Sequence, residues 1–238
     1  MDAITYAHAR SYNALNPISE ATRILADLGE EETVGKLLSV IQRYRLQGEL
    51  GIRLLHKHND ILDDEIMYES ALFDTDGFAL ETKAIPKSEC QALVANSWQL
   101  TGHVFMPVEF SDPALLVCPS FDIARHPDVL RELAQVLHET GAEYLLGPCL
   151  LYGTFVESHA PYQDSAFLEK TDTENRANVV RYVEMKDISF RNSAKTKWRA
   201  VQAIDDAGNL FWTTACNCFC SVFPSGGHQG TTSHRYTP

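Results

Sequence analysis

Residues 51–60 read Gly-Ile-Arg-Leu-Leu-His-Lys-His-Asn-Asp and contain two histidines separated by one residue. A strand from Ile52 to His58 would place alternate side chains on opposite faces of the sheet. Ile52, Leu54, His56 and His58 would then lie on one face, with Arg53 on the other. Because the histidines share their face with two aliphatic residues, we predict that both imidazoles point inward, towards a core or a cavity.

Length and composition are those of a soluble globular protein. The chain has 238 residues, of which 45% are hydrophobic and 22% charged. Its formal net charge of −12 argues against nucleic acid and anionic membranes as partners, since both select clustered Lys and Arg. No apolar run approaches the roughly 18 residues of a membrane helix, and the first residues lack a secretory signal. We therefore expect a cytoplasmic protein.

Helix and strand signals alternate along the chain. Asn16-Pro17 predicts a helix start, Gly29 its end, and a second helix follows the acidic residues 30–32. A short helix is expected to open at Pro86. The clearest strand-helix-strand unit runs from 115 to 146, and such crossovers favour parallel pairing. The C-terminal strands meet at a hairpin turn over residues 205–209.

These patterns predict an α+β fold in a single domain, residues 1–238: a curved, largely antiparallel sheet flanked by about four helices. A closed barrel with added helices is the alternative. Residues 1–15 are expected to form an N-terminal arm. Residues 157–176 are polar and acidic, which suggests a lid or mobile loop.

His56 and His58 are the leading candidates for chemistry. Neutral imidazoles ligate zinc, iron, copper and nickel, and they also titrate near neutrality. We expect His56, His58 and Glu65 to be catalytic, or His56, His58 and Asp63 to hold a divalent transition metal such as zinc or iron. The alternative is that one histidine is satisfied by the backbone in the core and the other is half-exposed at the end of the strand. The sequence contains no glycine-rich phosphate-binding motif, so no nucleotide cofactor is expected.

Cys216, Cys218 and Cys220 alternate along a predicted strand and would share one face. They could form a soft-metal site completed by His228 or His234. Their face also carries aliphatic and aromatic residues, which favours small buried hydrophobes over a metal site. The six cysteines do not have the spacing of a secreted disulfide framework, which agrees with a reduced compartment.

Two resemblances involve the His-Lys-His segment. It is similar to the metal motif of cupins, in which a glycine precedes His-x-His and a carboxylate follows. Here Gly51 is one residue too close to His56, and Asp63 replaces the usual Glu. The resemblance implies a cupin-like barrel with added helices as the alternative fold. Leu54-Leu55-His56-Lys57-His58 also resembles a stretch in filamentous-fungal proteins without an established activity. That likeness implies a fungal cytosolic protein attached to specialised metabolism.

Our leading hypothesis is a small-molecule enzyme of the lyase, isomerase or cyclase type, acting through the histidine pair. The alternative is a non-catalytic metal- or ligand-binding protein, and the third is a structural protein in which the histidines only pack. The expected partner is a small-molecule substrate, and a homo-oligomer is compatible with the sequence.

Overall fold

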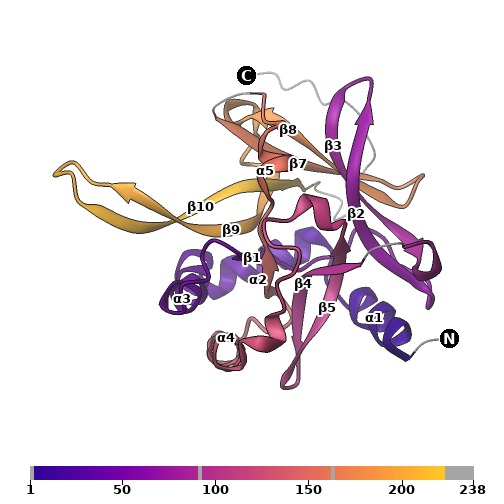
Figure 1. Cartoon of the computed structure of the whole chain (residues 1–238), viewed down its shortest axis with the longest axis horizontal. Helices are drawn as coiled ribbons and strands as arrows, with labels where there is room; N and C mark the ends of the chain where they lie inside the picture. Colours follow the sequence, from indigo (N-terminus) through magenta and orange to yellow (C-terminus); the bar gives the residue numbers. More distant parts are fainter. Residues whose placement is uncertain (1–2, 91–92, 162–163, 223–238) are drawn as a thin grey trace.

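The computed structural model describes residues 3–90, 93–161 and 164–222. Within these ranges ten strands form one closed barrel in the order β1-β6-β4-β5-β2-β3-β8-β7-β10-β9, and β9 pairs with β1 to close it (Figure 1). All pairings are antiparallel except β2 with β5 and β7 with β10. The strands are β1 Leu50–Leu54, β2 Glu65–Asp74, β3 Gly77–Pro86, β4 Val94–Thr101, β5 Val104–Ser111, β6 Leu146–Leu150, β7 Ser165–Asp172, β8 Ala177–Glu184, β9 Ser193–Ile204 and β10 Leu210–Ser221.

The α+β class and the largely antiparallel pairing are thus confirmed, but the sheet does not stay open. It closes on itself, which is nearer to the barrel alternative than to a curved sheet flanked by helices. Closure removes the two exposed edges that an open sheet would present.

The helices are α1 Ala3–Asn13, α2 Ile18–Leu28, α3 Glu30–Arg43, α4 Pro127–Thr140 and the short α5 Thr154–Glu157. The predicted start after Pro17 is confirmed, and so is the stop at Gly29, whose φ of 81° is left-handed. Gly141 ends α4 in the same way. Within the described ranges, no helix combines the length and the apolar character needed to span a lipid bilayer.

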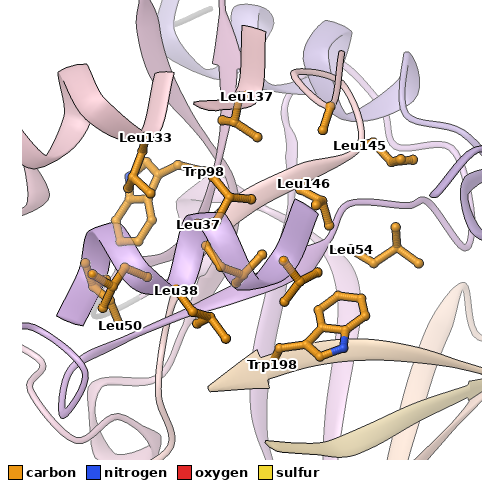
Figure 2. Packing of buried hydrophobic residues seen from close by; sticks show 14 of the residues in the cluster. Leu37, Leu38, Leu50, Leu54, Trp98, Leu133, Leu137, Leu145, Leu146 and Trp198 are labelled. Atoms are coloured by element: carbon orange, nitrogen blue, oxygen red, sulfur yellow. The ribbon is translucent and has the colours of Figure 1, made fainter. Parts of the chain in front are cut away.

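The largest core lies between the helices and the outer face of the barrel (Figure 2). Leu37 of α3 and Leu133 of α4 pack in one cluster with Leu54 of β1, Leu146 of β6 and Trp198 of β9. Burying each leucine contributes about 1.5–3 kcal/mol. The aliphatic face of β1 therefore points outward to the helices, away from the barrel interior.

Gly147 of β6 lies where two strands approach closely. A Cβ at this position would be 1.8 Å from the carbonyl oxygen of Trp98 on β4. Only a residue without a side chain fits there, because the obstacle is backbone.

Several predictions of local structure are wrong. The N-terminal arm is helix α1, in which Tyr12 is fully buried. The helix expected at Pro86 is a single 3-10 turn, Lys87–Glu89, followed by β4. Residues 115–118 are not a strand, and β6 after α4 pairs antiparallel with β1 and β4, so there is no parallel crossover. The segment 157–176, expected as a lid or mobile loop, contains barrel strand β7.

Candidate functional site

The interior of the barrel is polar and charged. Arg53 of β1 forms an ion pair with Glu109 of β5, and each residue is only 6% exposed. Strands β6 and β4 separate β1 from β5 in the barrel, so the two side chains meet across its interior. Side chains alternate along a strand, and Leu54 faces the helices outside. The inward residue of β1 is therefore Arg53, the reverse of the predicted assignment of faces.

His56 and His58 lie just beyond β1, which ends at Leu54 rather than continuing to His58 as predicted. Both rings are nevertheless buried, with side-chain exposures of 1% and 2%. Nδ1 of His56 lies 2.9 Å from the carbonyl oxygen of Leu54. Because a carbonyl only accepts, Nδ1 carries the proton and Nε2 holds the lone pair of the neutral ring. Nδ1 of His58 lies 2.9 Å from the hydroxyl oxygen of Thr171.

Glu169 completes a convergence of donors with the two histidines. Its Oε2 lies 3.7 Å from Nε2 of His56 and 3.7 Å from Nε2 of His58. Cys220 joins the group because β7 and β10 run parallel with Glu169 and Cys220 in register. One ligand atom from each of the four residues lies within 4.8 Å of all the others. We call these four residues, His56, His58, Glu169 and Cys220, the interior cluster.

Electrostatics keep the Glu169 carboxylate ionised inside the barrel. Burial alone would raise its pKa, but interactions with His56, Arg53 and His58 outweigh burial and hold the pKa well below its usual range. The neighbouring Cys220 thiol behaves oppositely, since burial and the charge of Glu169 raise its pKa. The interior cluster therefore combines a carboxylate with a protonated thiol.

A second polar network surrounds Glu69 of β2, which is 1% exposed. Its carboxylate accepts hydrogen bonds from Ser111 (Oγ to Oε1, 3.0 Å) and from Tyr152 (OH to Oε2, 2.9 Å). Asn96 donates to the Ser111 hydroxyl. Burial, followed by the charge of Glu69, raises the pKa of Tyr152 well above its usual value. This tyrosine therefore keeps its proton and is a hydrogen-bond donor held against a carboxylate.

The two networks are linked around the barrel wall. Thr82 of β3 pairs in register with Glu69, Asn178 of β8 pairs with Thr82, and Thr171 of β7 pairs with Asn178. Residues paired in register project from the same face of a sheet. The side-chain amide of Asn178 and the hydroxyl of Thr82 are buried and have no hydrogen-bond partner among the described residues. The interior thus retains hydrogen-bonding capacity between Glu69 and His58.

A small cavity of about 40 Å³ borders Tyr152. Lys197 and Cys218 contribute to its lining, and the Lys197 ammonium lies 3.8 Å from the centroid of the Tyr152 ring. The cavity has room for about one water molecule.

The structure does not bring the predicted carboxylates into the interior cluster. Glu65 accepts two hydrogen bonds from Arg176, 2.9 and 2.7 Å long, and a third from the backbone of Leu62. Arg176 lowers the pKa of Glu65. Asp63 is exposed in the turn between β1 and β2. Sequence proximity to the histidines therefore did not identify the carboxylate that faces them.

The three alternating cysteines do not act as one group. The register of β10 against β9 shifts between Cys216 and Cys218 and again after Cys218. Cys218 packs beside Phe167 in an apolar cluster, whereas Cys220 reaches Glu169. The predicted partners His228 and His234 lie outside the described residues.

Sequence reasoning missed Arg53, Glu109, Glu169 and the separate position of Cys220. A local sign of the strand is the short apolar run Ala166-Phe167-Leu168. The polar and acidic residues around this run concealed it, and the run does not show that Glu169 faces inward. Nothing local predicted Arg53 and Glu109 as partners, since 56 positions separate them.

Comparison with known proteins adds no assignment: no family model, no curated protein and no solved structure matches the chain.

Proposed function

We propose that this chain is a small-molecule enzyme of the lyase, isomerase or cyclase type whose chemistry takes place inside the barrel. One observation carries the proposal: Glu69, Glu109 and Glu169 all interact electrostatically with one buried guanidinium, that of Arg53. Burying charge is costly unless it is paired and hydrogen-bonded. A barrel of this size could be filled with aliphatic side chains instead, so the charged interior favours a functional role.

The groups available are those that move protons. Glu169 is an ionised carboxylate between two imidazoles, and Tyr152 is a hydroxyl donor on Glu69. An elimination or isomerisation beside a carbonyl needs a base to remove a proton and a donor to polarise the oxygen. Each well-placed group contributes roughly two to four orders of magnitude in rate. His56 and His58 would serve either as proton-transfer groups or as ligands of a divalent ion. The proposal keeps the expectation of a cytoplasmic enzyme with a small-molecule substrate.

Hydrogen exchange tests this proposal without knowledge of the natural substrate. A panel of β-keto acids, β-hydroxy acids and unsaturated ketones is incubated with the protein in D₂O, and deuterium at carbon is followed by NMR. We expect catalysed exchange for at least one chemical class. In the double variant His56→Ala/His58→Ala, the rate of catalysed exchange should fall by at least about a hundredfold.

The matched control is His103→Ala, which removes an exposed histidine at the turn between β4 and β5. It should exchange at the wild-type rate. If the double variant is folded by circular dichroism and exchanges as fast as the control, the histidine pair has no catalytic role.

A non-catalytic metal-binding protein is the second candidate. The observation in its favour is that the interior cluster is closed: the side chains of His56, His58 and Glu169 are at most 6% exposed. Structural metal sites use four protein ligands and are closed, whereas catalytic sites keep one position for water or substrate. A bound ion without exchange activity on any compound of the panel would favour this candidate.

A further inference from the structure

We propose that the interior cluster is a binding site for one zinc-class divalent ion, with His56 Nε2, His58 Nε2, Glu169 Oε2 and Cys220 Sγ as ligands. This ligand set differs from the one predicted from the sequence, which paired the histidines with Asp63. Ion binding is separable from catalysis, so the proposal does not depend on the enzymatic role above.

The distances favour an ion over a shared proton. An N–H···O hydrogen bond spans about 2.7–3.2 Å, and the separation of 3.7 Å between Nε2 of His56 and Oε2 of Glu169 is too long for one. Bonds of about 2.0–2.2 Å from nitrogen and oxygen to a tetrahedral zinc ion place those atoms about 3.3–3.5 Å apart. The two histidine–carboxylate separations of 3.7 Å are longer than this by only a few tenths of an ångström. The remaining pairs, all within 4.8 Å, need to close by about 1.5 Å at most.

Buried polar atoms point into the same space. Neither Nε2 of His56 nor Oε2 of Glu169 has a hydrogen-bond partner among the described residues. When the ring carries a single proton, the first holds a lone pair, since Nδ1 of that ring donates to the Leu54 carbonyl. The lone pairs of Nε2 and of the Glu169 carboxylate then repel each other unless a proton or a metal ion lies between them. Unsatisfied buried groups are rare in folded proteins, and an ion would satisfy both.

The contacts made by the Nδ1 atoms of the two histidines are also those expected in a metal centre. Metal-ligating histidines almost always use the second ring nitrogen to contact a carbonyl, a carboxylate or water, which fixes the ring orientation. Here the Leu54 carbonyl holds the ring of His56, and the Thr171 hydroxyl holds that of His58. Both rings are therefore oriented with Nε2 towards Glu169.

Charge balance explains why an ion would be stable there. Glu169 supplies one negative charge, and Cys220 supplies a second when its thiol proton is released to solvent on binding. Together these charges neutralise a divalent cation. A neutral centre is the least costly way to bury an ion. Imidazole, carboxylate and thiolate are each among the ligands that bind zinc.

Metal loading of the full chain provides the test. Protein stripped with chelator is dialysed against Zn²⁺ or Co²⁺, and the bound metal is measured by elemental analysis. We expect one ion per chain and a rise in melting temperature. The Co²⁺ form should show the near-ultraviolet charge-transfer band of a cobalt–thiolate bond, together with intense visible bands of tetrahedral cobalt.

Two variants identify the ligands. Cys220→Ser should abolish the charge-transfer band, whereas Cys216→Ser, the matched control on the same strand, should retain it. Glu169→Gln should weaken binding by roughly tenfold or more. A wild-type chain that takes up no ion and shows no thermal shift would overturn the proposal, as would a charge-transfer band that persists in Cys220→Ser. Histidine-dependent deuterium exchange by a chain that takes up no metal would leave the enzymatic proposal intact and remove this one.

Discussion

The guanidinium of Arg53 and the carboxylate of Glu109 form an ion pair across the interior of the barrel, between strands that are not neighbours. Removing one partner leaves the other charge buried, so Glu109→Leu or Arg53→Met should each lower the free energy of unfolding by about 3–5 kcal/mol. Urea denaturation measures this effect. The double variant should recover much of the loss.

The control for this ion pair is Arg23→Ala, which breaks exposed pairs with Glu20 and Asp27 on α2. It should change the stability by less than about 1 kcal/mol. If Glu109→Leu and Arg53→Met lowered the free energy of unfolding as little as Arg23→Ala does, the barrel interior would have to be hydrated. The ion pair would then be unimportant for folding.

Gly147 and Gly35 should respond oppositely to replacement by alanine. A Cβ at Gly147 meets the Trp98 backbone, whereas one at Gly35 in α3 meets nothing within 4 Å. Gly147→Ala should therefore abolish or severely weaken folding. Gly35→Ala should raise the stability by about 0.5–1 kcal/mol, because alanine is the better helix former. Thermal unfolding distinguishes the two, and a stable Gly147→Ala barrel would show that β4 and β6 can separate.

Glu65 should make the free energy of unfolding depend on pH in the acid range. Arg176 lowers the pKa of Glu65 in the folded state below its unfolded value. The ionised form therefore stabilises the fold above the unfolded pKa, and this contribution disappears as the pH falls through the lower folded value. Arg176 is 39% exposed, so solvent screening limits the contribution to about 1 kcal/mol.

Comparing Glu65→Gln with wild type at two pH values measures that contribution. The variant should be less stable at pH 7, and the difference should shrink in strong acid. If the stability difference between Glu65→Gln and wild type were equal at both pH values, the charge of Glu65 would not contribute to stability.

Thr171 should affect the affinity for the proposed ion, because its hydroxyl orients the ring of His58. Thr171→Val keeps the shape of the side chain but removes the hydroxyl that lies 2.9 Å from Nδ1 of His58. Ion affinity, measured by competition with a chelating dye, should fall by about 10- to 100-fold. Asp63→Asn, which changes the exposed residue predicted as a ligand from the sequence, should leave the affinity unchanged. The opposite ranking of these variants would restore Asp63 as the ligand.

The sequence alone predicted much of the local structure. Pro17, Gly29 and Gly141 marked helix ends correctly because capping and left-handed backbone are properties of single residues. The C-terminal hairpin followed from the turn at 205–209 for the same reason. The α+β class was likewise within reach of pattern and composition. Both histidines are buried as predicted, but not on the strand face from which their burial was predicted, because they lie beyond the end of β1.

Only the tertiary structure decided that the sheet closes into a barrel. Closure reversed the predicted inward and outward faces of β1. Once helices cover the outside of the barrel, the aliphatic residues of β1 point outward, and Arg53 points inward. Alternation along a strand tells which residues share a face but not which face is enclosed. Closure also brought Glu169 and Cys220 to the histidines from more than 100 positions away. Such contacts depend on strand order and register, which no local pattern encodes.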